Sequence, residues 1–177
     1  MRTDPAAFIP FLKSMLKRFD GNTYKTHDNI KMGTNEGPAA VEELIKYLEE
    51  KSGAEDLHPL LWSEPLAKAS TNMALAQGPT GGTGHTGPDG STMSSRITDA
   101  MKLFGQEWEA TIGENIMYRS GSPLMAVLNL AIDDGVASRG HRTNIFKDSF
   151  YYTGAGTEPH KIYESETVVT YSGSYSL

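Results

Sequence analysis

The chain of 177 residues contains no cysteine. Disulfides, thiolate nucleophiles, cysteine-ligated zinc and iron–sulfur clusters are therefore excluded. The sequence also lacks any run approaching the roughly 18 apolar residues of a membrane span. Residues 1–20 show neither the apolar stretch nor the cleavage site of a secretory signal, so the protein either stays inside the cell or has lost its signal. Since secreted proteins of this length fold without bridges, the missing cysteines leave the compartment open.

Basic residues are the minority, with 16 Lys and Arg against 22 Asp and Glu, and the net charge is −6. This balance argues against a nucleic-acid-binding surface, which needs clustered Lys and Arg. Residues 1–35 are instead net positive, with six basic and three acidic groups, or +3. Residues 36–177 therefore carry a net charge of −9. We expect this first segment either to dock on the acidic remainder or to form a surface helix with solvated lysines.

Apolar residues recur at helical spacing in five segments that have capping signals. The predicted helices run from Asp4-Pro5 to Gly21, from Pro38 to Gly53, from Ser63 to Gly78, from Ser91 to Gly105, and onward from Ser122-Pro123. Pro10 is expected to bend or delay the first turn of the first helix.

Strand-like alternation follows the helices, in residues 108–118, 150–156 and 167–172. Residues 22–35 are predicted to form a polar loop and residues 135–149 an irregular segment. The order, helices first and strands last, predicts an α+β fold in which helices cover an antiparallel sheet.

Four local motifs hold the candidate chemistry: His85 in GHTGPDGSTMSSRI, Glu114 in GENI, Asp133 and Asp134 in LAIDDGVASRG, and His141 in GHRTNI. Two imidazoles with two or three carboxylates fit a polar cleft that binds a divalent cation, with zinc, copper or nickel favoured. The same groups fit acid–base chemistry, because nearby carboxylates keep a histidine protonated. Spacing alone leaves a third interpretation open, in which these are loop residues bonded to backbone.

Several ordered stretches resemble the CAP superfamily, or SCP-like domains, which includes cysteine-rich secretory, antigen 5 and pathogenesis-related proteins. They are LHPLLWSEPLAKAS, GHTGPDGSTMSSRI, IGENI, AVLNLAIDDGVASRGHRTNIF and VVTYSG. The GHRTNI form and the absent cysteines are similar to the bacterial and simple-eukaryote branches. The resemblance implies an α-β-α sandwich with a three-stranded antiparallel sheet between helical layers. It also implies a CAP/SCP-like domain over residues 35–177, preceded by an amphipathic helix and loop extension over residues 1–34.

The family's cleft holds two histidines and two acids. By motif, His85 resembles the first histidine, Glu114 the first acid and His141 the second histidine. The stretch AVLNLAID aligns Asp133 with the second acid, usually a glutamate, and Asp134 is the alternative. The resemblance implies that His85 and His141 are the ligands of any bound metal ion, with zinc the expected one.

Polar residues beside these motifs are possible further site residues. Ser138 precedes His141 by three positions, which by itself is no evidence of an activated serine. Arg142 and Asn144 are expected to orient loops and cap helices rather than touch a ligand. Arg96 and Arg139 are expected to anchor loops through salt bridges.

Aromatic and histidine side chains outside the motifs are given ordinary structural roles. Trp62 and Trp108 are predicted to belong to the core. His27, His58 and His160 are predicted to be isolated surface histidines.

The resemblance implies a non-enzymatic, extracellular binding module with a His/acid cleft able to hold a divalent metal ion. Two alternatives remain open at this point. One is a metal-assisted, peptidase-like hydrolase in which Glu114 polarises water or orients His141. The other is a sterol or lipid carrier. The partner is a small molecule, lipid or protein rather than nucleic acid, and the oligomeric state stays open.

Overall fold

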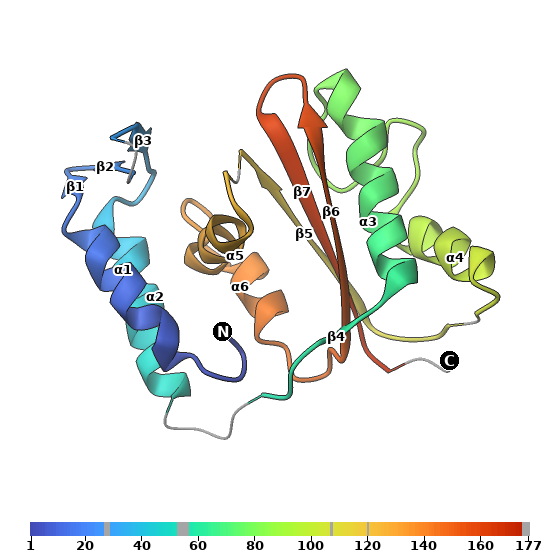
Figure 1. Ribbon diagram of the computed structural model, residues 1–177, viewed down its shortest axis with the longest axis horizontal. Helices are drawn as coiled ribbons and strands as arrows, with labels where there is room; N and C mark the ends of the chain where they lie inside the picture. The colour runs from blue at the N-terminus through green and yellow to red at the C-terminus, as the bar shows by residue number, and fades with distance from the viewer. Residues whose placement is uncertain (27–28, 53–56, 107, 120, 175–177) are drawn as a thin grey trace. The chain divides into compact units, whose positions relative to one another are not determined.

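The computed structural model describes residues 1–26, 29–52, 57–106, 108–119 and 121–174. The chain forms two compact units (Figure 1). The first unit comprises Met1–Pro59 and Ala131–Phe146, and the second comprises Leu60–Leu130 and Lys147–Leu177. None of the helices in the described part of the chain has the length and apolar character that a bilayer crossing requires.

Two helices of the first unit, α1 (Ile9–Leu16) and α2 (Pro38–Lys51), run side by side in Figure 1. Pro38 is the first residue of α2, as predicted. A 3-10 turn, η1 (Ala6–Phe8), precedes α1, because Pro10 has no N–H for a regular first turn. Apolar faces pack between the helices and bury Leu12, Met15, Val41, Leu44 and Leu48.

Residues 22–35 are not simply a polar loop, so that prediction is wrong. The segment contributes β2 (Thr23–Lys25) and β3 (Lys31–Gly33) to an antiparallel sheet that begins with β1 (Phe19–Asp20). The strands are only two or three residues long, and Tyr24 is the one described residue in them that is buried. They therefore lack the alternation of apolar and polar residues by which a strand is identified.

Residues 135–149 are not wholly irregular, because they contain helix α6 (Gly140–Ile145). The side chain of Arg139, the N-cap residue, makes no capping hydrogen bond to this helix. The backbone of Arg139 lies in the left-handed region, with φ 50°. The carboxylate of Asp133 instead accepts from the backbone N–H of His141 at 2.8 Å. A cap that comes from outside the helix start leaves no local signal in the sequence.

The sheet of the second unit has four strands instead of the predicted three. They are ordered β4-β6-β7-β5. The three long strands, β5 (Ile112–Tyr118), β6 (Tyr152–His160) and β7 (Glu164–Ser172), are antiparallel, and two-residue β4 (Leu61–Trp62) adds to β6 in parallel. The α+β class is confirmed, and the α-β-α layering stays a prediction.

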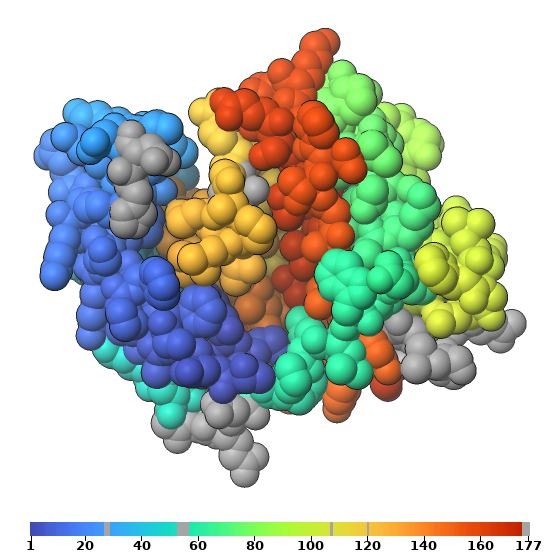
Figure 2. All heavy atoms as spheres, in the orientation of Figure 1, coloured from blue at the N-terminus to red at the C-terminus, as the bar shows by residue number. Residues whose placement is uncertain are grey.

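Helix α3 (Glu64–Gln77) covers this sheet, and Figure 2 shows its atoms along those of β6 and β7. Ser63 caps it as predicted, by accepting from the backbone N–H of Leu66. A Cβ atom at Gly154 or Gly156 would overlap the backbone of α3. These two glycines therefore let helix and strand approach more closely than any side chain would permit.

Helix α4 (Met93–Leu103) is capped by Thr92 and not by Ser91, so the predicted cap is off by one residue. Thr92 and Ser95 form a reciprocal capping box. The core between α3 and α4 comprises Leu66, Ala69, Ile97, Ala100 and Met101.

The two tryptophans differ in environment. Trp108 packs against the core between α3 and α4, as predicted. Trp62 is 58% exposed, so its assignment to the core is wrong. It lies on the two-residue strand β4, where its Nε1 donates to the carboxylate of Glu64 at 2.9 Å.

The histidines outside the motifs are not all surface residues. His160 is only 4% exposed, and its Nε2 donates to the carbonyl of Gly82 at 2.8 Å, so that prediction is wrong. His58 is half-buried, and Arg2 donates to its carbonyl oxygen at 3.1 Å. His27 lies outside the described residues.

Candidate functional site

Glu114 forms the centre of a buried charge cluster in the second unit. Its side chain is 3% exposed on β5, and Arg96 from α4 donates to both carboxylate oxygens, at 3.0 and 2.8 Å. Nδ1 of His85 lies 2.9 Å from Oε1 of the same carboxylate. The hydrogen bond with Glu114 raises the pKa of His85, against the opposing effects of partial burial and the Arg96 charge. Arg96 thus anchors the cluster by a salt bridge, as predicted.

The glycine-rich loop that carries His85 is fixed by Gln77 and Tyr118, which the sequence did not single out, and by Arg96, which it did. Nε2 of Gln77 donates to the carbonyl of Gly84 at 3.1 Å, and the N–H of Gly84 donates to the hydroxyl of Tyr118 at 3.0 Å. That hydroxyl donates in turn to Oε1 of Gln77 at 3.1 Å. Arg96 adds a bond to the carbonyl of His85 at 3.2 Å. No local pattern announces these contacts, because the partners lie on α3 and β5.

A second carboxylate, that of Glu166 on β7, is buried near the same cluster. Glu166 stands directly across from Tyr118 in the β5–β7 register and has no exposed surface. Among the described residues, neither of its carboxylate oxygens has a hydrogen-bond partner. Burial, together with the charge of Glu114, raises the pKa of Glu166 to about 7, with Arg96 acting against the rise. The sequence gives no signal for this residue, because the alternation of apolar and polar residues in β7 does not reveal a buried acid that lacks a partner among the described residues.

Asp133 and His141 form a second His–acid pair, in the first unit. Nδ1 of His141 lies 2.6 Å from Oδ1 of Asp133, and the other oxygen accepts from the backbone N–H of His141 at 2.8 Å. The Asp133 side chain is 1% exposed and that of His141 27%. Asp133 has φ 58°, a left-handed conformation that aspartate tolerates better than most residues.

Asp134 has different partners from its neighbour Asp133. Its carboxylate accepts from the backbone N–H groups of Asn35 and Glu36, at 2.7 and 2.8 Å. The two adjacent acids are therefore used separately, Asp133 for the histidine and Asp134 for the segment that precedes α2.

Arg139 and Arg142 stabilise the loop around the second pair. Arg139 bridges Glu36 and Glu43, at 2.7 and 2.6 Å, which confirms the predicted salt bridge and lowers the pKa of both acids. Arg142 is 4% exposed, contacts Glu43 at 2.6 Å and donates to the carbonyl of Ala131. These contacts agree with an orienting role for Arg142.

The remaining possible site residues lie close to His141 in the chain. Ser138 is exposed in the turn before α6, and Asn144 is half-buried within α6. Whether either touches a ligand stays a prediction.

The structure thus brings His85 together with Glu114, and His141 together with Asp133. In the described part of the chain, no group of three or more His, Asp and Glu residues is arranged to hold a metal ion. Both acids already accept hydrogen bonds on both oxygens, so they are suited to orienting imidazoles rather than to ligating metal. Any metal bound here would take imidazole nitrogens as its protein ligands.

Comparison with known proteins gives one family match. The model of the cysteine-rich secretory protein family, CAP, matches residues 18–171. That match begins at residue 18, before Asn35, the predicted first residue of the CAP/SCP-like domain. The boundary between an extension over residues 1–34 and the domain stays a prediction. No sequence among the curated proteins matches the chain significantly.

Two solved structures are similar in fold, each with 17% sequence identity and a TM-score of 0.52. One is an extracellular protein containing an SCP domain from Bacillus anthracis, and the match covers 75% of this chain and 40% of that one. The other is an outer surface protein from Borrelia burgdorferi, with coverage of 87% and 98%. The present chain therefore spans less than half of the solved Bacillus chain and nearly all of the solved Borrelia chain.

Proposed function

We propose that this chain, which belongs to the cysteine-rich secretory protein (CAP) family, is a non-enzymatic binding module that works outside the cell. In this proposal the imidazoles of His85 and His141 bind a divalent cation, with zinc the expected one. The observation that carries the proposal is that each imidazole directs Nδ1 to a buried carboxylate, at 2.9 and 2.6 Å.

Such pairs are the usual support of metal-binding histidines. A carboxylate that accepts from Nδ1 fixes the tautomer and orientation of the ring and makes Nε2 the ligand atom. Binding requires neutral imidazole, so protons compete with the metal. Because Glu114 raises the pKa of His85, this competition extends to higher pH than it would for an ordinary histidine.

The geometry of Glu114 favours binding over hydrolysis. A general base must reach the proton that it removes, directly or through one water. Glu114 is 3% exposed, and Arg96 holds both of its oxygens. The peptidase-like alternative would be supported by cleavage of a diverse peptide pool with zinc, read by mass spectrometry and abolished in Glu114→Ala. The sterol or lipid carrier would require saturable uptake in a sterol-binding assay.

Isothermal titration with zinc tests the binding proposal. The wild-type chain should release heat that falls in His85→Ala and in His141→Ala and is absent from the double variant. His58→Ala, outside both pairs, should behave as wild type. Loss of all heat in either single variant would mean that both rings serve one ion. Equal heats in wild type and double variant would refute the metal proposal.

The location outside the cell rests on the family and on the two similar structures, one of an extracellular protein and one of an outer surface protein. Protease treatment of intact producing cells tests it, with an internal enzyme as control. Protection of the protein equal to that of the internal enzyme, together with its absence from the medium, would contradict it.

A further inference from the structure

His85 receives little support from its own segment of the chain. The described residues 81–92, which follow the 3-10 turn η2 (Gly78–Thr80) and precede α4, form neither helix nor strand. The His85 side chain is 56% exposed, so packing fixes little of its orientation. His141 differs, because it lies on α6 and the acid beside it, Asp133, also accepts from its backbone N–H. The orientation of His85 therefore depends on contacts from other elements.

Three elements of the second unit end beside this loop. β5 and β6 both pair antiparallel with β7, so they run in the same direction and their last residues, Tyr118 and His160, lie at one edge of the sheet. The two rings are 5.2 Å apart and meet edge to face. Figure 1 shows α3, whose last residue is Gln77, ending beside the hairpin of β6 and β7. There the N–H of Lys161 donates to the carbonyl of Gly78 at 2.9 Å.

Gln77 and Tyr118 together hold the backbone on both sides of His85. Nε2 of Gln77 donates to the carbonyls of Gly84 and Thr86, at 3.1 and 3.4 Å. The Tyr118 hydroxyl accepts from the N–H of Gly84 at 3.0 Å and donates to Oε1 of Gln77 at 3.1 Å. One hydroxyl and one amide thus close a ring of hydrogen bonds that includes both backbone groups of Gly84.

His160 fastens the same loop nearer its start. Its Nδ1 accepts from the N–H groups of Ile162 and Tyr163, at 3.2 and 3.1 Å, so the ring proton is on Nε2. Nε2 donates to the carbonyl of Gly82 at 2.8 Å. The side chains at the ends of α3, β5 and β6 therefore hold the loop at residues 82, 84 and 86.

The burial of these polar side chains indicates that they select one loop conformation. Gln77 is 1% exposed and His160 is 4% exposed, although apolar side chains fill such positions at less desolvation cost. Hydrogen bonds made away from water are strengthened, and a fully bonded polar network specifies a single arrangement. Gly84 has φ 90°, a conformation open mainly to glycine, which lets the loop meet all of these partners.

We propose that Gln77, Tyr118 and His160 are positioning residues for His85. They hold the loop so that Nδ1 of the imidazole meets Glu114 and Nε2 is presented to a ligand. The consequence for metal affinity rests on the proposed function. Because His141 is held by α6 and Asp133, its affinity for a metal ion should not depend on these residues.

Zinc titration of full-length His141→Ala, which keeps only the His85 pair, tests the effect on affinity. Adding Tyr118→Phe removes one hydroxyl and keeps the ring, and should weaken zinc binding about tenfold, because two hydrogen bonds that order the loop are lost. Gln77→Met keeps the length of the side chain and His160→Phe keeps a ring, and both should also weaken binding. Urea unfolding checks that each variant is folded.

Two controls separate positioning from general destabilisation. Tyr163→Phe makes the same chemical change on a neighbouring ring, 5.1 Å from that of Tyr118, and should bind zinc as its parent does. In a His85→Ala background, which keeps only the His141 pair, Tyr118→Phe should leave zinc binding unchanged. Equal weakening by Tyr118→Phe and Tyr163→Phe, or equal weakening in both backgrounds, would overturn the proposal.

NMR of the metal-free chain supplies a readout that does not depend on the proposed function. Tyr118→Phe should shift the ring ¹⁵N signals of His85 and speed hydrogen exchange of the Gly84 amide, whereas Tyr163→Phe should do neither. Unchanged His85 signals in both Tyr118→Phe and Gln77→Met would overturn the positioning role. If His141→Ala binds no zinc, the proposed function fails at His85, and these signals alone decide the positioning role.

Discussion

Arg96 donates to both carboxylate oxygens of Glu114, at 3.0 and 2.8 Å, within the interior of the second unit. The acid is therefore already compensated when His85 approaches it. His85 is held by Glu114 through its ring and by Arg96 through its carbonyl oxygen. One ion pair thus sets both the orientation and the protonation of the histidine.

The protonation of His85 should depend on Glu114. The folded-state pKa of His85 is raised above its ordinary value of 6.5. The resulting stabilisation is present in full below pH 6.5 and is lost as the pH rises through the folded-state pKa. In Glu114→Gln, NMR titration of His85 should show a lower pKa than in wild type. The exposed Glu109→Gln should leave the titration unchanged, and an unaltered pKa in Glu114→Gln would contradict the assignment.

Ionisation of Glu166 should destabilise the fold as the pH rises from 4.5 to about 7. Its folded-state pKa of about 7 lies above the ordinary 4.5, so the native state binds more protons than the unfolded state between these values. Stability therefore falls as the pH rises from 4.5 to 7. The substitution Glu166→Gln replaces the acid by a neutral isostere and should remove this fall. At pH 8 the free energy of unfolding of the variant should exceed that of the wild type, in which Glu166 is ionised, by about 3 kcal/mol.

Urea unfolding across this pH range provides the measurement. The exposed Glu50→Gln on α2 is the matched control and should keep the wild-type slope. A Glu166→Gln variant with the same pH slope as wild type would show that Glu166 does not titrate in this range.

Two substitutions of Asp133, whose backbone is left-handed, should differ in their effect on stability. Asp133→Asn and Asp133→Ala both remove the charge that faces His141. Asparagine tolerates a positive φ of 58° better than alanine does, and it keeps an oxygen that can accept from the backbone N–H of His141. The alanine variant should be the less stable of the two by about 1 kcal/mol or more. Chemical denaturation checks this, and equal stability would mean that the loop relaxes to an ordinary conformation.

Even a methyl side chain at the contact between β6 and α3 should destabilise the fold. Gly154→Ala places a Cβ against the backbone of α3 and should cost about 1–3 kcal/mol in free energy of unfolding. Gly33→Ala is the matched control, because no heavy atom of the described residues beyond Gly33 and its two chain neighbours lies within 4 Å of its Cβ position. That variant should change stability by no more than about 0.5 kcal/mol. Equal stability of the two variants would show that α3 moves away at little cost.

Much of the local structure follows from the sequence. Ser63 and Pro38 begin their helices as predicted, and the two C-terminal strands pair in antiparallel fashion. The predictions are wrong where an element is too short to show a pattern or where its stabilising contact comes from a residue outside the element. Two-residue β4 is too brief for any period to show, and α6 takes its cap from Asp133 rather than from its own N-cap residue.

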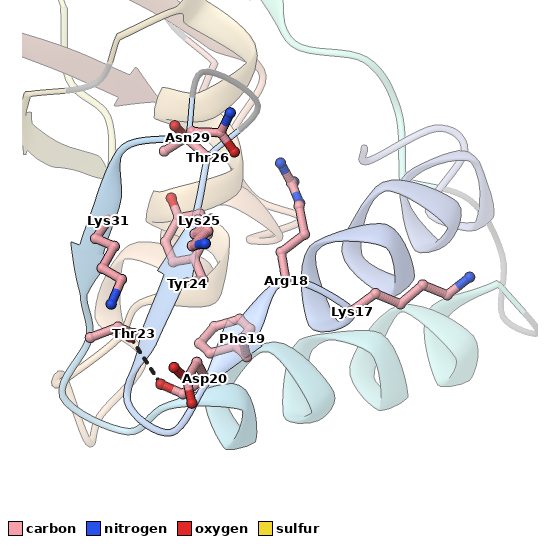
Figure 3. A pocket seen from close by; sticks show the side chains of 10 residues that line it. All are labelled: Lys17, Arg18, Phe19, Asp20, Thr23, Tyr24, Lys25, Thr26, Asn29 and Lys31. Atoms are coloured by element: carbon pink, nitrogen blue, oxygen red, sulfur yellow. Dashed lines mark hydrogen bonds between the residues drawn. The ribbon is translucent and has the colours of Figure 1, made fainter.

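The sequence by itself determined the family motifs and the chemistry they offer, including His85 beside glycine and the acids of GENI and LAIDD, because these depend on residue type and spacing along the chain. The tertiary structure alone decided which groups meet. Among the described residues, strand register and burial leave both carboxylate oxygens of Glu166 without a hydrogen-bond partner. The register also places Arg18, Lys25 and Lys31 at successive positions across the sheet of the first unit (Figure 3). Those pairings join separate elements, and the cost or gain of each arises from desolvation and charge in three dimensions, which local sequence does not encode.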